Sequence, residues 1–439
     1  MEQDLHTSPG EDRMAKVREQ RAQRRRKRRL SAFVTILGIV LLTGAIILIL
    51  NDGGTMLSGL LGDRPAHTPQ AEQAQADADK YTSITVAAVG SISVSDPQLA
   101  DARTADGYDF SPSFFGAADL LSGADLTVAD LECNFAGSPY GTATSSAPNV
   151  LADNLAGLGI DLLQTANCAS IANGMAGLES TIVNIRRAGM QPVGTFASSQ
   201  DWRDSGGMTM VEVGGIRVAF IAFTKGLGNM SLPENSAKCV NLLYTDYDTN
   251  YSDLDTSGIV SAMAGVRKQD PDVIIVLVHW GSEYSRQVSE SQKRLARLLY
   301  ENGADAIIGT HSHMVGPIDE HTVTLDDGTE KDVVTAYDLG DFYTGSTKPG
   351  TQTSAVLRMT FTRNNWTGKV RLSECSYQPL FCADLGTSVP NRYQVLGIEN
   401  AIALYEQDYV YRVSEETYER LKEELEEFPE HIAMPEEAP

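Results

Sequence analysis

The sequence predicts an α/β fold for residues 82–382 of this 439-residue chain. Short apolar runs of strand length alternate with longer segments of helical periodicity, and this alternation is typical of α/β proteins. Histidines directly follow two of the apolar runs, where buried strands are expected to end. Because open α/β sheets place their sites outside the carboxyl ends of their strands, the pattern also predicts where a functional site lies.

The expected elements follow one another from residue 83 onward. Strands are predicted at residues 83–89, 126–129, 160–164, 208–213, 216–223, 273–278, 304–308, 333–338 and 355–361. Helices are predicted at residues 114–121, 177–188, 257–267 and 289–302. After residue 382 the pattern weakens. Residues 415–427 (EETYERLKEELEE) predict a short acidic helix that is either solvated or binds a partner.

Charge is distributed unevenly along the chain. The formal net charge is −23, yet residues 1–30 hold ten Lys and Arg against five Asp and Glu, a net of +5, so the remaining 409 residues carry −28. An acidic body argues against nucleic-acid binding, which requires basic surface. It also disfavours a polyanionic ligand unless a metal ion or a local basic patch intervenes.

Residues 31–50 (SAFVTILGIVLLTGAIILIL) contain no charged residue and would form a helix about 30 Å long, enough to cross a bilayer. They follow the basic run RRRKRR, so the positive-inside rule places residues 1–30 in the cytoplasm and the main domain outside the cell. A cleaved signal peptide is the alternative. The run is long for such a peptide, and the NDGG sequence after it lacks the small-x-small pattern of a cleavage site. We therefore expect an uncleaved signal anchor, single-pass in the cell membrane.

The domain organisation follows from these segments. A flexible linker is expected at residues 51–81, because Gln, Ala, Asp, Gly and Pro dominate there and little can be buried. The main domain is placed at residues 82–382, and residues 383–439 form a C-terminal extension. Of the five cysteines, Cys375 and Cys382 are close enough in sequence to form a disulfide, which an extracellular location permits without requiring. The spacings do not define a disulfide framework.

Three histidines give the clearest indication of function. His279 ends the run at residues 273–278, and His311 and His313 stand in the sequence GTHSH after the run at residues 304–308. The other four histidines lie in expected tails, linkers or loops. Neutral imidazole is the commonest protein ligand for zinc-like ions, and His-x-His with a remote histidine is a metal-ligand spacing. Strand ends can also carry a histidine for hydrogen bonding or capping, and that alternative stays open.

Together these motifs resemble those of the CapA-type capsule synthesis proteins, a membrane-anchored poly-γ-glutamate group with a metallophosphatase-like fold. The resemblance covers about residues 82–375. It is carried by Tyr108-Asp109-Phe110, Ala124-Asp125-Leu126, Asp130-Leu131-Glu132, Gly177-Leu178, His279-Trp280-Gly281-Ser282-Glu283-Tyr284, Gly303-Ala304-Asp305, His311-Ser312-His313 and Leu339-Gly340-Asp341-Phe342. The HWG and GTHSH blocks are the specific ones; the others are weak alone.

The resemblance implies a four-layered metallo-dependent-phosphatase-like sandwich, with two mixed sheets face to face and helices outside. It implies a role in the assembly of capsule, poly-γ-glutamate or another envelope polymer. An anionic envelope polymer as ligand and membrane-bound polymer synthesis subunits as partners are implied in the same way.

Three of the family's five metal motifs are altered here. The first normally reads Gly-Asp, and this chain has Gly90-Ser91. The second normally reads Asn-Leu-Glu, and here Asp130-Leu131-Glu132 keeps the glutamate. The third normally reads Ala-Asn-Asn-His, and here it is Ala166-Asn167-Cys168-Ala169. A carboxylate, a ligand amide and the histidine expected to act as general acid are thereby lost.

The resemblance assigns Glu132, Cys168, His279 and His311 to one metal position, an acceptable set for Zn or Mn. The second position keeps only Glu132 and His313. Two-metal phosphoesterases need carboxylates to hold both ions about 4 Å apart, so we expect this second position to be weak or empty. The expected cofactor is therefore one divalent ion.

Three functions remain open. The favoured one is a degenerate centre that binds polymer with little or no hydrolysis, because losing a general acid costs ~10²–10⁴ in rate. The second is a single-metal hydrolase or transferase, with Glu132 or Asp130 as base. The third is a scaffold without metal. Ser91, Asn167, Trp280 and Glu283 are expected to support the site.

Overall fold

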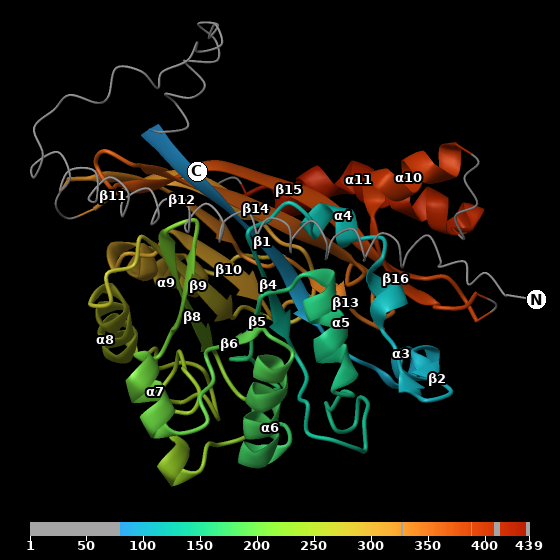
Figure 1. Ribbon diagram of the computed structural model, residues 1–439, viewed down its shortest axis with the longest axis horizontal. Helices are drawn as coiled ribbons and strands as arrows, with labels where there is room; N and C mark the ends of the chain where they lie inside the picture. The colour runs from blue at the N-terminus through green and yellow to red at the C-terminus, as the bar shows by residue number, and fades with distance from the viewer. Residues whose placement is uncertain (1–79, 326–327, 388, 408–412, 436–439) are drawn as a thin grey trace, which may run out of the picture.

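The computed structural model of the protein describes residues 80–325, 328–387, 389–407 and 413–435. Two β-sheets lie face to face with helices around them, which confirms the prediction of an α/β fold with mixed sheets (Figure 1). The predicted anchor at residues 31–50 lies outside the described residues, as does nearly all of the linker. Within the described ranges, no helix is both long and apolar enough to cross a membrane.

The first sheet has the strand order β16-β15-β14-β1-β4-β5-β6, and β13 also pairs with β1. Its strands are β1 (Tyr81–Ile92), β4 (Leu126–Leu131), β5 (Leu162–Gln164), β6 (Gln191–Val193), β13 (Asp341–Tyr343), β14 (Thr353–Asn364), β15 (Val370–Asp384) and β16 (Tyr393–Gly397). Neighbours among β1, β4, β5, β6 and β13 pair in parallel, while β14, β15 and β16 are antiparallel to their neighbours. The carboxyl ends of the parallel strands therefore share one edge.

The second sheet has the order β11-β12-β10-β9-β8-β7. Its strands are β7 (Thr209–Val213), β8 (Ile216–Thr224), β9 (Val273–His279), β10 (Ala306–Thr310), β11 (Ile318–Thr324) and β12 (Glu330–Ala336). The four central strands are parallel, and β7 and β11 are antiparallel edges. A separate pair is formed by β2 (Arg103–Thr104) and β3 (Gly107–Tyr108).

The main core lies between the two sheets. Val86 and Val128 of the first sheet share one buried cluster with Phe220 and Ile275 of the second. The outer face of the second sheet is also covered, by α8 (Thr256–Arg267) and α9 (Glu290–Glu301). Because β8 and β9 are buried on both faces, their sequences read as continuous apolar runs instead of alternating ones.

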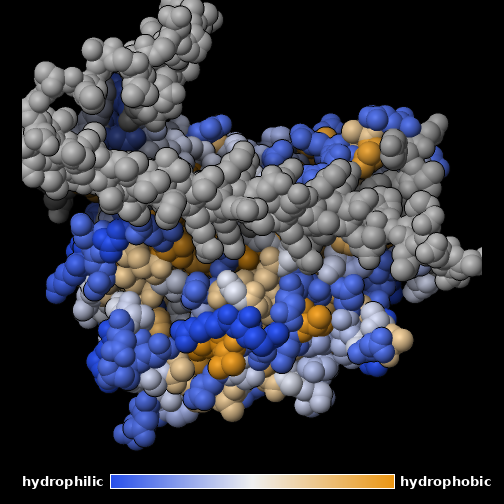
Figure 2. Space-filling model, in the orientation of Figure 1, coloured by the Kyte–Doolittle hydropathy of each residue, from blue (hydrophilic) through white to orange (hydrophobic). Residues whose placement is uncertain are grey.

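Most of the remaining helices lie over or beside the first sheet, and α7 (Ser199–Ser205) lies next to α8 (Figure 1). The remaining helices are α3 (Asp96–Asp101), α4 (Ala118–Leu121), α5 (Val150–Leu158), α6 (Gly174–Arg187), α7, α10 (Ile398–Glu406) and α11 (Glu415–Ile432), with 3₁₀ turns at Ser111–Phe114 and Glu234–Ser236. On the face seen in Figure 2, hydrophilic residues lie mostly towards the sides, and hydrophobic residues gather in patches in the middle.

Local signals explain where helices begin. Ser289 precedes α9, and its hydroxyl accepts a hydrogen bond from the Gln292 backbone N–H at 3.3 Å. In return, the Gln292 side chain accepts one from the Ser289 backbone N–H at 3.0 Å. This reciprocal pair is a capping box, which satisfies two donors that a helix start leaves free. The helix then buries Leu295 and Leu299 against the second sheet.

The C-terminal part of the chain belongs to the same body of structure. Strand β15 runs through residue 382, where the sequence placed the end of the main domain, and α10 and α11 contact β15. Cys375 and Cys382 both lie in β15 and are free. Residues seven apart in one strand are about 23 Å apart, so the disulfide considered between them is wrong.

Helix α11 is not a solvated helix, so that alternative for the acidic segment is wrong. Its residues Leu421, Glu424 and Phe428 are buried. Glu424 accepts a hydrogen bond from the Thr353 hydroxyl and pairs with Arg420. Phe428 reaches the cluster between the two sheets. One face of the helix is therefore buried, including Glu424, and the other acidic residues, such as Glu423, Glu426 and Glu427, are exposed.

Replacing Phe428 with alanine is expected to lower the free energy of unfolding by about 3–5 kcal/mol, because removal of the buried ring leaves a cavity in the core. Urea denaturation followed by circular dichroism measures this loss. Glu426→Ala, at an exposed position of the same helix, is the matched control and should stay within about 0.5 kcal/mol of the unchanged protein. Equal losses in the two variants would show that α11 does not contribute to the core.

Candidate metal centre

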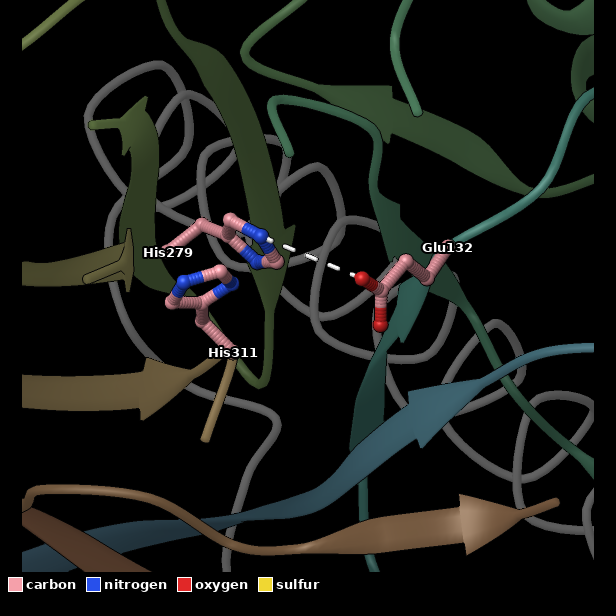
Figure 3. Close-up of side chains that lie close together, drawn as sticks. All are labelled: Glu132, His279 and His311. Carbon is pink, nitrogen blue, oxygen red and sulfur yellow. Dashed lines mark ion pairs between the residues drawn. The ribbon is translucent and has the colours of Figure 1, made fainter. Parts of the chain in front are cut away.

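The histidines singled out in the sequence meet one glutamate at the carboxyl edge of the two sheets. Glu132 directly follows β4, His279 is the last residue of β9, and His311 and His313 follow β10. Figure 3 shows Glu132, His279 and His311 pointing towards one another from three strands. Residues almost 180 positions apart in the chain thus come together because parallel strands end at a common edge.

Glu132, His279 and His311 form the first cluster. One ligand-type atom from each lies within 4.8 Å of the others. His279 Nε2 is 4.0 Å from Glu132 Oε1, and the two imidazole rings are 4.5 Å apart between centroids. His279 is fully buried and His311 is 6% exposed. These atoms are close enough to share one ion after small side-chain movements that bring each within about 2.0–2.2 Å of it.

The cluster contains unsatisfied polar atoms. Among the described residues, Glu132 Oε2, His279 Nε2 and His311 Nδ1 are buried and have no hydrogen-bond partner. More than nine in ten buried polar groups in proteins are paired, so three adjacent exceptions need an explanation. All three are atoms that ligate zinc or manganese. The residues present therefore fit a divalent cation.

His279 is oriented from behind by polar groups. Its Nδ1 lies 3.2 Å from the Thr310 hydroxyl and 3.7 Å from Asp130 Oδ2. With the proton on Nδ1, the lone pair of Nε2 faces the cluster. Asp130 in turn accepts hydrogen bonds from the Ser91 hydroxyl at 2.9 Å and from the Asn167 amide at 2.8 Å. Both carboxylate oxygens of Asp130 are therefore engaged.

His311 is held in the form that binds metals. Burial, followed by the charges of His279, Lys225 and His313, lowers its pKa far below the ordinary value, so the ring is neutral. Lys225 lies just after β8 and is half-buried, and its ammonium donates a hydrogen bond to the Gly281 carbonyl at 2.8 Å. The sequence did not single out Lys225.

Cys168 lies beside the first cluster without joining it. Its thiol donates a hydrogen bond to Glu132 Oε1 at 3.0 Å, and its sulfur is absent from both groups of converging ligand atoms. Burial and the adjacent Glu132 carboxylate raise the pKa of this thiol well above its ordinary value. Since thiolates ligate metals, sulfur ligation would require Cys168 to lose this proton. In the observed geometry the thiol orients Glu132.

A second cluster adjoins the first through Glu132. It consists of Glu132, His313 and Asp341, whose ligand-type atoms also lie within 4.8 Å of one another. His313 Nδ1 is 3.0 Å from Asp341 Oδ1 and 3.8 Å from Glu132 Oε2. Burial lowers the pKa of His313, but the hydrogen bond and charge of Asp341, with the charge of Glu132, outweigh it and raise this pKa to about 10. The sequence did not identify Asp341 as a site residue, although it lies in the Leu339–Phe342 segment noted for the family.

The two histidines that follow β10 adopt left-handed backbone conformations, with φ of 108° at His311 and 63° at His313. Such conformations cost side-chain-bearing residues about 1–3 kcal/mol each and persist only when neighbours hold them. Asp338 does so from a buried position: its carboxylate accepts hydrogen bonds from the Ser312 N–H at 2.6 Å and from the Gly340 N–H at 2.8 Å. Asp338 thus fixes the loop that carries both rings.

Tyr284 contacts a site histidine, whereas Trp280 belongs to the buried cluster under α8 and α9. Trp280 donates its indole hydrogen to the Tyr337 carbonyl at 2.9 Å and stacks on the Tyr337 ring. Tyr284 stacks on His313 with centroids 5.4 Å apart, and the Lys348 ammonium lies 3.4 Å from the Tyr284 centroid. Glu283, between Trp280 and Tyr284 in sequence, acts on the nearby Lys225 through its charge.

Comparison with solved structures finds distant similarity. A structure described as a novel phosphatase from Mycoplasma pneumoniae is 14% identical, with a TM-score of 0.39, over 68% of this chain and 94% of that one. A hypothetical protein from Thermus thermophilus gives the same identity and TM-score over 67% of this chain and 98% of that one.

Similarity to curated proteins is closer. The PGA biosynthesis protein CapA of Bacillus subtilis (strain 168) is 26% identical over 212 residues, 48% of this chain and 50% of that protein. The capsule biosynthesis protein CapA of Bacillus anthracis is 26% identical over 202 residues, 46% and 44% of the two chains. The chain thus matches about half the length of these relatives.

The sequence model of the bacterial capsule synthesis protein PGA_cap matches residues 85–346, more than half of the chain. These residues contain every member of both clusters, and the chain belongs to the PGA_cap family of bacterial capsule synthesis proteins.

Proposed function

We propose that this protein binds a divalent metal ion through Glu132, His279 and His311 and uses it to hold an anionic polymer during capsule or envelope polymer assembly. The observation that carries the proposal is the convergence of Glu132, His279 and His311 from three strands, with His279 Nε2 and His311 Nδ1 buried and without a hydrogen-bond partner. A site with one carboxylate and two imidazoles suits Zn or Mn. Three protein ligands leave a coordination position open, which a carboxylate or phosphate of the polymer can take.

Charge supports a metal-bridged contact. The chain after residue 30 carries a net charge of −28, so an anionic polymer is repelled by the body of the protein as a whole. A divalent cation at the sheet edge reverses the sign of the field locally and can contact carboxylates of protein and polymer together. The Lys225 ammonium adds positive charge at the same edge. On this account the ion is what makes polymer binding favourable.

We propose binding with little or no hydrolysis. Ala169 stands where the family resemblance puts a proton-donating histidine, and general acid catalysis is worth ~10²–10⁴ in rate. Asp130, which we considered as a base, has both carboxylate oxygens engaged by Ser91 and Asn167. The first cluster therefore has no histidine to act as general acid, and Asp130 is not free to act as a base.

A metal-dependent hydrolase or transferase is the second candidate. The observation that favours it is the second cluster, because Glu132 lies between His279 on one side and His313 on the other, with a separate oxygen facing each. Shared carboxylates of this kind hold paired ions in two-metal hydrolases. Turnover distinguishes this candidate from the first.

The wider setting of the protein is proposed on the same basis. We place the main domain outside the cell, as a metallo-dependent-phosphatase-like sandwich tethered by the residue 31–50 anchor, next to membrane-bound polymer synthesis subunits. The support is the uncharged segment after a basic run and membership of a capsule synthesis family. The full chain is expected to sediment with membranes, and a chain lacking residues 31–50 to be released.

Polymer binding by the full chain in lipid nanodiscs tests the function. We expect poly-γ-glutamate to bind when Zn²⁺ or Mn²⁺ is present and to dissociate on addition of EDTA, with no shortening of the polymer. His279→Ala should lose binding, whereas His321→Ala, on the exposed strand β11, should keep it. Binding that ignores EDTA contradicts the proposal. Polymer cleavage that His279→Ala abolishes would establish the hydrolase instead.

A further inference from the structure

Three strand ends of the first sheet lie side by side at the second cluster. Ser91 of β1 pairs with Asp341 of β13 on one side and with Asp130 of β4 on the other. The close approach of β13 depends on Gly90, because a Cβ there would lie 1.7 Å from the Gly340 carbonyl oxygen. The Ser91 N–H donates a hydrogen bond to that same oxygen at 3.0 Å. The position that lacks a carboxylate on β1 is therefore flanked by a carboxylate on the adjoining strand.

Asp341 is directed at the same space. Its side chain is 4% exposed and contacts His313 Nδ1 at 3.0 Å. Glu132 Oε2 lies on the other side of that nitrogen, at 3.8 Å, and is buried without a hydrogen-bond partner. The two oxygens of Glu132 therefore face different rings: Oε1 lies 4.0 Å from His279 Nε2, and Oε2 lies 3.8 Å from His313 Nδ1. A carboxylate placed in this way can bridge two ions.

We propose that Asp341 replaces the carboxylate missing at Ser91 and completes, with Glu132 and His313, a second divalent-ion position beside the first. This inference rests on the proposed function, since Glu132 serves both positions. It reverses the expectation from the sequence that this half of the centre is weak or empty. Binding exchanges the contact between His313 and Asp341 for bonds from both residues to the ion, and the proton between them leaves to solvent.

The two positions differ in chemistry. The first has one carboxylate and two imidazoles, which suits zinc, and the second has two carboxylates and one imidazole, a harder set that suits Mn²⁺. Ser91 is not a competing ligand in this arrangement, because its hydroxyl donates to Asp130 at 2.9 Å. In this arrangement Asp341 of β13 supplies the carboxylate that Ser91 of the adjoining parallel strand β1 does not.

Metal content and electron paramagnetic resonance of the full chain after equilibration with Mn²⁺ test the inference. We expect two ions per chain with a spin-coupled signal. Asp341→Asn should bind one ion and lose the coupling, and Asp332→Asn, an exposed carboxylate on β12, should bind two. Ser91→Asp in the Asp341→Asn background should restore binding of the second ion. Such a rescue would not occur if Asp341→Asn had lost the ion because it was misfolded.

The outcomes separate this inference from the proposed function. One ion in both the unchanged protein and Asp341→Asn overturns the second position and leaves the first standing. Two ions in both overturn the role of Asp341. No ion in the unchanged protein overturns the inference and the proposed function together. Circular dichroism of each variant confirms that the comparison is made between folded proteins.

Discussion

Replacing His279 with alanine is expected to lower the affinity of the protein for Zn²⁺ by at least about 100-fold. Loss of groups that only orient a ligand already costs 10–100-fold in affinity, so loss of a ligand itself should cost no less. His279 is fully buried, and its Nε2 has no hydrogen-bond partner that could compete for the lone pair. Competition titration against a chelator of known affinity measures the change.

His321→Ala is the matched control for this experiment. His321 is 39% exposed in its side chain, lies on β11 and contacts Asp319, away from both clusters. Its replacement should leave Zn²⁺ affinity unchanged. An equal loss in the two variants would mean that binding is unspecific, and an unchanged affinity in His279→Ala would remove that ring from the centre.

Replacing Asp338 with alanine is expected to lower the free energy of unfolding by about 3–5 kcal/mol. The backbone N–H groups of Ser312 and Gly340 would lose their acceptor, and an unsatisfied buried donor costs about 1–3 kcal/mol. The left-handed conformations of His311 and His313 would also lose the contact that holds the loop between them. Urea denaturation of the metal-free protein gives the loss directly.

Two comparisons make this result specific. Asp332→Ala, at an exposed position on the neighbouring strand, should change stability by less than about 0.5 kcal/mol. Asp338→Asn keeps one acceptor oxygen and should lie between the two. If Asp338→Ala were as stable as Asp332→Ala, the loop would have to be held by something other than this carboxylate.

Much of the sheet structure could be predicted, because the central strands are buried on both faces. The runs at residues 216–223 and 273–278 became β8 and β9 almost without change. Burial on both faces removes polar residues from a strand, and a continuous apolar run is easily recognised. The predicted helix at residues 114–121 is instead a 3₁₀ turn and the short helix α4. Between them Gly116 approaches β16 so closely that a Cβ would lie 2.5 Å from the Val395 carbonyl oxygen.

The C-terminal strands were missed for a related reason. In β15 the first nine residues are mostly exposed or half-buried, and only the last part is fully buried. The strand therefore contains both polar and apolar residues without a clear period. No local sequence pattern predicts the connection through which it pairs with β16. The helix predicted at residues 415–427 is present, but its extension to Ile432 and the burial of Phe428 and Ile432 against the core were not predicted.

In the site, the sequence identified the three histidines and Glu132 but not Asp341. The histidines could be found because each directly follows a recognisable strand. Asp341 reaches the site because β13 lies beside β1, where Asp341 pairs with Ser91. This register depends on the close tertiary contact between Gly90 and Gly340, which the sequence does not reveal. A lost ligand can thus be replaced from a neighbouring strand, where motif comparison along the chain does not detect it.

X-ray absorption at the zinc edge of the Zn-loaded full chain tests the central claim most directly. The account predicts imidazole nitrogens at about 2.0–2.1 Å, with the multiple scattering of histidine rings, and carboxylate oxygen at about 2.0–2.2 Å. It also predicts that the imidazole contribution falls in His279→Ala. A shell of oxygen alone, unaltered by that substitution, would contradict a centre built from Glu132, His279 and His311.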